Sequence, residues 1–467
     1  MTLVRHRRAL VASVATLVVL APLVWFWQAS LIPGSYQASS LGYHDYGGGP
    51  RLPGTTRSVA SLTEQVHRTP DVRVTLTARR ERGHGIDGYT LNHRSPGPTI
   101  RARQGQLVEV RLVNASVPDG VTLHWHGVDV PNAEDGVAGV TQDAVRRGHD
   151  FTYRFVVRHA GTYWYHSHQV SHEQVAGGLL GALVVEPAVA SPGREALALV
   201  HDYGGRRTVD GAAADRRVDA PAGAHVRVRV VNTNNGQLAT WPTGPYRVLA
   251  VDGHDVHEPG VVRDRSVIVA AGGRVDLDVT APARVELSGV ALVVGSATGD
   301  ARRPTRTLDL LRYGTPAPIG FDPATATRHF TYSIGRRPGF LGGRPGLWWT
   351  INGHPYPDVP MFTVDTGDVV VMRIDNHSGS VHPMHLHGHH VVVLRRNDIR
   401  ATGSPWWTDS LTVANNDTYD VAFVADNPGV WIDHCHNLPH ASDGLVTHLM
   451  YEGVTEPYRI GSRNHPE

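Results

Sequence analysis

Short runs of alternating apolar and polar residues recur along most of the chain, separated by turn-forming Gly, Pro, Asn and Asp. Because side chains at positions i and i+2 of a strand point to the same face, such runs are typical of half-buried β-strands. The clearest runs are residues 72–77, 106–113, 153–157, 182–186, 225–231, 274–279, 368–374 and 390–394. No long amphipathic helical pattern interrupts them, so the sequence predicts an all-β fold of packed sandwiches.

The N-terminal end follows a different pattern. Arg5, Arg7 and Arg8 precede an uncharged apolar run of 19 residues from Ala9 to Trp27. This length reaches the threshold for crossing a bilayer about 30 Å thick and exceeds the usual signal-peptide core of about 7–15 residues. We therefore favour an uncleaved membrane anchor over residues 1–30, with the body outside the cytoplasm; a cleaved export signal is the alternative. Residues 31–65, with frequent Gly and Pro, are predicted to form a tether.

An internal repeat fixes the number of domains in the body. Its first and last sections both carry H-x-H-G, then G-x4-H-x-H, then Gly-Leu, in the same order, whereas the section between them has no H-x-H. At about 150 residues per domain, 467 residues leave room for three. We predict sandwiches over residues 66–190, 191–316 and 317–467, of which the middle one supplies no metal ligands.

Two residue counts are unusual: there are 29 His and a single Cys, Cys435. One Cys cannot form an internal disulfide, and its neighbours His434 and His436 favour a thiolate ligand over a buried apolar residue. The 44 basic and 43 acidic residues give a formal charge of +1. A net charge this small does not indicate binding to nucleic acid, and nothing in the sequence implies an obligate protein partner.

Four H-x-H pairs stand at matching points of the two repeats. Each pair presents two imidazoles on one face of a strand, so four pairs predict a metal cluster shared by the first and last sandwiches. The pairs are His124/His126, His166/His168, His385/His387 and His434/His436. Imidazole alone suits copper, zinc, iron or nickel, but His382, Cys435 and His440 form a His₂Cys set typical of a blue-copper site. A structural zinc ion would require four tight ligands, typically with more thiolates.

These motifs resemble the copper-binding motifs of the multicopper oxidase family, which includes laccases and cuprous oxidases. The resemblance extends from about residue 65 to 456 and is carried by His124-Trp-His126-Gly, His166-Ser-His168, His382-Pro-Met-His385-Leu-His387-Gly and His434-Cys-His436-x3-His440-x4-Leu445. It implies three consecutive cupredoxin-like Greek-key β-sandwich domains and four copper ions. The type 1 copper would bind His382, Cys435 and His440; the type 2 copper His124 and His385; and the type 3 pair His126, His166, His168, His387, His434 and His436.

The implied reaction is one-electron oxidation of a small reducing substrate at the type 1 copper, coupled to four-electron reduction of O₂ to water at the other three. Cys435 would ligate one centre and its covalent neighbours the other, which gives electrons a short path between them. Leu445 stands at the axial position, where other members place Met or Leu. Since an alkyl side chain cannot donate to copper, we expect a strongly oxidising type 1 site.

The residues that supply protons are less clearly marked. Asp135, nine residues after His126, resembles an acidic residue that family members place beside the trinuclear cluster; an Asp-Gly turn is the alternative. Where bacterial cuprous oxidases often have Glu after the last type 1 ligand, this chain has Ala441, and Asp433 or Asp443 could substitute. His389 and His390 match no ligand position and are expected to be structural.

Two other functions stay open at the level of sequence. A copper nitrite reductase is also built from blue-copper domains, but it needs no type 3 pair. A copper-binding or copper-tolerance protein without turnover would be expected to contain more than five Met. The reducing substrate is undetermined, because a phenol, an aromatic amine or a low-valent metal ion such as Cu(I) would each fit.

Overall fold

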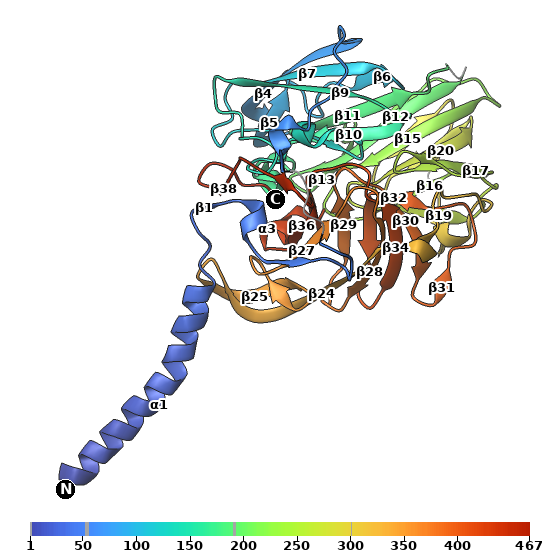
Figure 1. The fold of residues 1–467 in the computed structure, drawn as a ribbon. Coiled ribbons are helices and arrows are strands. Elements are labelled where there is room, and N and C mark those ends of the chain that lie inside the picture. The colour runs from blue at the N-terminus through green and yellow to red at the C-terminus, as the bar shows by residue number, and fades with distance from the viewer. Residues whose placement is uncertain (1, 52–55, 190–192, 300) are drawn as a thin grey trace.

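The computed structural model describes residues 2–51, 56–189, 193–299 and 301–467. Met1, residues 52–55 of the expected tether, residues 190–192 at the expected boundary of the first two sandwiches and residue 300 lie outside the described residues. Figure 1 shows a body built of strands, from which helix α1 (Thr2–Ala29) projects at the N-terminus. The predicted all-β fold with an N-terminal apolar helix is confirmed.

The first sandwich packs two sheets around a core made by alternating side chains. In β7, Val108, Val110 and Leu112 belong to this core while Arg111 is exposed. The strand orders are β5-β4-β7-β9 and β6-β11-β10-β8. The strands are β4 (Val72–Gly83), β5 (Ile86–Leu91), β6 (Ile100–Arg103), β7 (Leu107–Asn114), β8 (His124–His126), β9 (Asp150–Val156), β10 (Gly161–His166) and β11 (Leu180–Glu186).

The second sandwich repeats this architecture around a core that includes Val228, Val230 and Leu277. Its strand orders are β13-β12-β15-β20-β17-β18 and β14-β22-β21-β16-β19-β23. The strands are β12 (Arg194–Tyr203), β13 (Arg206–Val209), β14 (Arg216–Val218), β15 (His225–Asn232), β16 (Leu238–Pro242), β17 (Tyr246–Val251), β18 (His254–Asp255), β19 (Arg265–Val269), β20 (Arg274–Thr280), β21 (Ala283–Glu286), β22 (Ala291–Val294) and β23 (Arg306–Thr307).

The third sandwich has strand orders β2-β27-β36-β35-β29-β33 and β26-β25-β24-β28-β34-β30-β31, with β32 beside β30. Strands β24 and β25 pair as far as Leu341 and Arg344, whereas β28 accompanies β24 only to Ile334, so the outer half of this hairpin extends beyond the sheet. The strands are β24 (Arg328–Leu341), β25 (Arg344–Ile351), β26 (His354–Pro355), β27 (Pro360–Val364), β28 (Val369–Asn376), β29 (His382–Leu386), β30 (Val391–Arg396), β31 (Ile399–Arg400), β32 (Trp407–Thr408), β33 (Ser410–Val413), β34 (Thr418–Val424), β35 (Val430–Cys435) and β36 (Val446–Tyr451).

The segment between α1 and the first sandwich lies against the third sandwich. Short strands in it pair with the body: β1 (Ser35–Tyr36) with β38 (Ile460–Gly461), β2 (Tyr43–Asp45) with β27, and β3 (Arg57–Ser58) with β37 (Val454–Thr455). The helical elements of the body are short: α2 (Ser171–Gln174), α3 (Leu438–Ser442) and 3₁₀ turns at Ala38–Ser40, Val59–Ser61, Asn132–Glu134, Leu310–Arg312 and Pro323–Thr325.

The first and third sandwiches are joined by a buried amide. Asn132 Nδ2 donates to the carbonyl of Val430 at 3.0 Å, and the N–H of Val430 donates to Asn132 Oδ1 at 3.0 Å. Asn427 Nδ2 donates to the carbonyl of Val130 at 3.0 Å. Because Val430 begins β35, these bonds fix that strand against the first sandwich.

Candidate metal centres

The four H-x-H pairs meet where the first and third sandwiches touch. On the first sandwich, β8 runs antiparallel to β10 with His124 opposite His166; on the third, β29 runs antiparallel to β35 with His385 opposite His434. The repeat in the sequence therefore corresponds to the same pair of neighbouring strands, used twice. All eight histidines are at most 1% exposed: His124, His126, His166, His168, His385, His387, His434 and His436.

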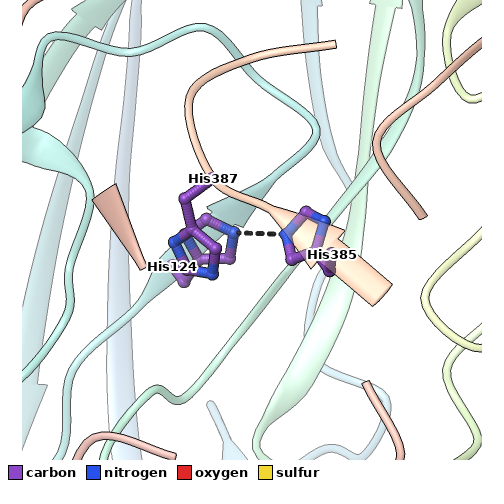
Figure 2. A group of neighbouring side chains, drawn as sticks. All are labelled: His124, His385 and His387. Atoms are coloured by element: carbon purple, nitrogen blue, oxygen red, sulfur yellow. Dashed lines mark hydrogen bonds between the residues drawn. The ribbon is translucent and has the colours of Figure 1, made fainter. Parts of the chain in front are cut away.

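Ring nitrogens from the two sandwiches approach one another closely. His124 Nε2 lies 3.4 Å from His385 Nε2, and the ring of His387 stacks 3.7 Å from that of His124 (Figure 2). His434 Nε2 lies 3.4 Å from His168 Nε2 and 3.3 Å from His387 Nε2. Atoms bound about 2 Å from one ion lie roughly 3.3–3.6 Å from each other in tetrahedral or trigonal geometry, so these separations fit metal coordination.

A further group of rings completes the cluster. The ring of His126 lies 4.9 Å from that of His436 and 5.8 Å from that of His166, and the last two are 5.6 Å apart. The eight imidazoles thus converge from four strand ends on one buried volume.

The protonation state of these rings suits a metal. Burial lowers the pKa of His126, His166, His168, His385, His387 and His436 well below the usual range and that of His434 to about 3, so the imidazoles are neutral. Nitrogens of His126, His166, His168 and His436 have no hydrogen-bond partner within the described part of the chain. Because unpaired buried polar atoms are costly, the donor set fits one or more bound metal ions.

His382, Cys435 and His440 form a second donor set. Cys435 Sγ lies 3.6 Å from His382 Nδ1 and 3.7 Å from His440 Nδ1, and the two Nδ1 atoms are 3.1 Å apart. The ligands come from the start of β29, the end of β35 and α3. Ser378 Oγ lies 2.7 Å from His382 Nε2, and Asn437 Nδ2 lies 3.2 Å from His440 Nε2. These contacts orient both rings with Nδ1 toward the sulfur.

The environment of this second set also suits a metal ion. Burial raises the pKa of the Cys435 thiol, and a bound cation would supply the positive charge that stabilises a thiolate there. Burial lowers the pKa of His382 to about 3. Burial also lowers the pKa of His440. Leu445 is fully buried beside the set, and its backbone bonds to the N–H of Cys435 and the carbonyl of His440 at 3.1 and 3.0 Å.

Asp135 contacts the imidazole cluster directly. Its Oδ1 lies 3.0 Å from His124 Nδ1 and 3.1 Å from His387 Nδ1, and the side chain is buried. Burial raises the pKa of Asp135, while the neighbouring His124 opposes that shift. Of the two other acids considered, Asp433 is buried in the third sandwich and Asp443 is exposed.

Sequence reasoning missed Asp409, which precedes β33. Its carboxylate lies 3.1 Å from His126 Nε2, and its backbone carbonyl lies 2.8 Å from His385 Nδ1. Arg274, from β20 of the second sandwich, donates from both terminal nitrogens to the Asp409 oxygens at 2.7 and 2.6 Å. Burial raises the pKa of Asp409, but Arg274 and His126 outweigh it and hold the pKa well below the usual range.

His390, which the sequence predicts to be structural, contacts the same network of charged side chains. Its Nε2 lies 3.1 Å from Asp409 Oδ2, and its Nδ1 lies 3.4 Å from Asp129 Oδ1. Burial lowers the pKa of His390, but the two carboxylates raise it to about 10. The signal that could have identified it is its position: His389 and His390 directly extend the H-x-H-G motif.

Stacked β-sandwiches with a His₂Cys set beside a cluster of eight imidazoles define a cupredoxin-type metalloprotein. Sequence profiles of the multicopper oxidases match residues 75–189 and 323–453. The chain is 28% identical over 467 aligned residues to the multicopper oxidase MmcO of Mycobacterium tuberculosis, covering 84% of this chain and 89% of that protein. It is 28% identical over 449 residues to laccase-1 of Botryotinia fuckeliana, covering 78% of each.

Solved structures give the same result. The multicopper oxidase of Pseudomonas thermotolerans superposes with a TM-score of 0.67 at 27% identity, covering 82% of this chain and 100% of that one. This chain therefore belongs to the multicopper oxidase family, and it is a laccase-like oxidoreductase that uses O₂ as oxidant.

Proposed function

We propose that this protein binds four copper ions and couples one-electron oxidation of a phenol, an aromatic amine or a low-valent metal ion to reduction of O₂ to water. The observation that carries the proposal is the position of Cys435. Its sulfur belongs to the His₂Cys set, while the adjacent His434 and His436 belong to the imidazole cluster. Copper, when bound, supplies one-electron redox chemistry at the first set and O₂ chemistry at the second.

The residues would divide among the ions as follows. His382, Cys435 and His440 would hold the type 1 ion, with Leu445 at its axial position, and His124 and His385 the type 2 ion. The convergence of His168, His387 and His434 supports one type 3 site, and that of His126, His166 and His436 the other.

His440 is the ligand through which a reductant would deliver electrons. His382 and Cys435 are fully buried, whereas His440 keeps part of its surface exposed. Trp349 packs against both imidazoles, with ring centroids 4.7 Å from His382 and 4.6 Å from His440. The indole therefore shields part of both rings from water, while His440 stays partly accessible to a reductant.

Asp135 would take part in O₂ reduction at the imidazole cluster. Hydrogen bonding to Nδ1 of both His124 and His387 holds these rings with Nε2 toward the cluster. Of the acidic residues considered from the sequence, Asp135 is the one that contacts the imidazole cluster, so its carboxyl group can hold a proton beside that cluster.

We also propose that the enzyme works outside the cytoplasm, anchored by α1. The helix from Arg5 to Ala29 is long and apolar enough to span a bilayer. The basic residues before its apolar run favour an N-terminus on the cytoplasmic side of the membrane. Cleavage within the segment would instead release a secreted form.

The decisive experiment combines metal analysis, colour and oxygen uptake on copper-loaded full-length protein in detergent. We expect four copper ions per chain and a blue absorption that bleaches with a reductant under anaerobic conditions and returns in air. Rates with a phenol, Cu(I) and Mn(II) would identify the substrate class. One bound ion, or zinc, would contradict the proposal; bound copper without oxygen uptake would indicate a copper-binding protein.

Variants test the assignment of the two donor sets. Cys435→Ser should remove the blue absorption. His168→Asn should lower the copper content of the protein but keep the blue absorption. His225→Asn is the control, because the His225 side chain is 66% exposed and lies outside both sets. Loss of the blue absorption in His168→Asn, with the absorption of His225→Asn unchanged, would contradict the assignment.

A further inference from the structure

The β24–β25 hairpin is held against the end of α1. Trp27 Nε1 donates to the carbonyl of Gly343 at 3.1 Å, and the N–H groups of Gly342 and Gly343 donate to Ser30 at 3.0 and 3.2 Å. Gly343 has φ +77°, and a Cβ there would lie 3.0 Å from the indole nitrogen of Trp27. Glycine therefore favours this contact, which fixes the hairpin tip to the helix where α1 leaves the body (Figure 1).

The end of α1 has the composition of a membrane–water interface. Trp25, Phe26 and Trp27 are 63%, 56% and 43% exposed, and aromatic residues of this kind gather at the level of the lipid headgroups. If the apolar run from Ala9 to Trp27 spans the bilayer, the hairpin tip bonded to Trp27 must lie at the same level.

The hairpin itself is suited to that position. The stretch from Arg336 to Trp349 carries Arg336, Arg337 and Arg344 and no acidic residue. Leu347, which pairs with Pro338 in the part of the hairpin that extends beyond the sheet, is 51% exposed. Arginines bind anionic headgroups, and an exposed leucine among them can insert below them.

The same hairpin covers the His₂Cys set. Trp349 of β25 contacts the rings of His382 and His440, and the Arg336 guanidinium lies 4.3 Å from the Trp349 ring centre. The face of the protein that α1 turns toward the bilayer is therefore the face at which the type 1 ligands approach the surface.

We propose that the β24–β25 hairpin docks on a bilayer carrying anionic headgroups, so that the His440 edge receives electrons from lipophilic hydroquinones dissolved at the membrane surface. The inference rests on the oxidase function and uncleaved anchor proposed above. Each hydroquinone loses two electrons and two protons as it becomes a quinone. Two of them thus supply the four electrons and four protons that convert one O₂ into two waters.

Docking is tested with a fluorophore on a single introduced thiol. Because Cys435 is fully buried, a Leu347→Cys variant can be labelled selectively. The copper-loaded, full-length protein is reconstituted into phosphatidylcholine–phosphatidylglycerol vesicles with brominated acyl chains. Val261→Cys is the control, since Val261 is 49% exposed and belongs to the second sandwich. We expect the bromolipid to quench the Leu347→Cys label several-fold more than the Val261→Cys label; equal quenching overturns the proposal.

The consequence for the reductant is tested by kinetics in vesicles of the same headgroup composition. Oxygen uptake is compared for a decyl-substituted hydroquinone and unsubstituted hydroquinone, which is water-soluble and uncharged. In an Arg337→Glu/Arg344→Glu/Leu347→Glu variant, we expect kcat/KM for the decyl donor to fall about fivefold, because charge attraction and insertion are both lost. The uncharged water-soluble donor should be oxidised at the parental rate, because it neither partitions into the bilayer nor responds to the added negative charge.

A control variant, Arg206→Glu/Val261→Glu/Arg263→Glu, introduces the same charges at exposed positions of the second sandwich and should oxidise both donors like the parent. Equal loss with both donors in the hairpin variant would overturn the proposal, because it would mean that the hairpin only supports the type 1 set. A parent that oxidises neither donor would overturn the hydroquinone assignment, and label quenching would still report whether the hairpin docks. Absence of oxygen uptake with a phenol, Cu(I) and Mn(II) alike would instead refute the oxidase function.

Discussion

Replacing Arg274 by methionine should strongly destabilise the protein, because this side chain connects all three sandwiches. Arg274 lies on β20 of the second sandwich and is 1% exposed. Its terminal nitrogens bind Asp409 of the third sandwich at 2.7 and 2.6 Å, and its Nε donates to the carbonyl of Thr162 in the first at 3.1 Å. Asp252 lies 3.5 Å from the same guanidinium.

The size of the effect follows from burial. Removing one partner of a buried ion pair costs about 3–5 kcal/mol of unfolding free energy, because the remaining charge stays desolvated. Methionine fills much of the volume but removes the guanidinium beside Asp252 and leaves Asp409 with the His390 imidazolium as its remaining cation among the described residues. For a domain of about 150–250 residues, each 1 kcal/mol lowers the unfolding midpoint by roughly 2–4 °C, so we expect a decrease of about 10 °C.

The assay is a thermal scan followed by tryptophan fluorescence, with two matched variants. Arg274→Lys keeps the charge but cannot form the two parallel bonds, so its midpoint should fall between those of the parent and Arg274→Met. Arg111→Met removes a similar bidentate pair with Asp150 at the surface and should leave the midpoint unchanged. If Arg274→Met and Arg111→Met unfold at the same temperature, the argument from burial is refuted.

Three further predictions concern the metal centres and their surroundings. Leu445→Met should lower the reduction potential of the type 1 site in a redox titration, since a thioether donates to copper and an alkyl group does not; an unchanged or higher potential would remove Leu445 from the axial position. Asp135→Asn should slow O₂ consumption while sparing anaerobic bleaching of the blue absorption by substrate, and equal loss of both would contradict a role confined to the O₂ side. In copper-free protein, the His390 imidazolium should stabilise the fold fully below pH 6.5 and progressively less as pH rises toward its folded pKa of about 10, by about 1.4 kcal/mol per pH unit. His390→Asn should flatten this part of the pH–stability profile, and a profile parallel to the parent's would show that His390 is not the titrating group.

The candidate ligands could be predicted because their spacing is set by local geometry. H-x-H places two rings on one face of a strand whatever the rest of the fold does, and the repeat shows that two such strand pairs are equivalent. In the structure, the pairing of His124 with His166 and of His385 with His434 follows this equivalence. The meeting of the two strand pairs depends on a contact that no local pattern encodes, the bonding of Asn132 to Val430.

Polar residues on strands were harder to interpret from sequence. The alternation from Arg274 to Val279 predicts a strand with one face in water, yet Arg274 and Asp276 are each 1% exposed. Asp276 accepts a hydrogen bond from Thr162 Oγ1 at 2.6 Å and lies against Arg229. Alternation shows that one face of a strand is polar, but it does not show whether that face contacts water or a polar face of another domain. The ion pair between Arg274 and Asp409 could therefore not be predicted from the sequence.

The segment before the first sandwich shows a related limit. Residues 31–65 lack any apolar period, and we expected a tether. Strands of two or three residues, such as Tyr43–Asp45 on β27, are held by backbone hydrogen bonds and are too short to leave a period in the sequence. Pairing of this kind attaches the described parts of the segment to the third sandwich, the domain that carries the His₂Cys set.

Among the described residues, the second sandwich contributes no side chain to either donor set, yet it helps to shape the imidazole cluster. Gly272, just before β20, has φ +79°, and a Cβ there would lie 2.7 Å from His126 Cε1 and 2.9 Å from His436 Cδ2. Its carbonyl accepts a hydrogen bond from Trp164 Nε1 of the first sandwich at 2.9 Å. A glycine is therefore required where the second sandwich closes over rings from the other two. Together with Arg274, which holds Asp409 beside His126, this contact means that the imidazole cluster is complete only when all three sandwiches are assembled.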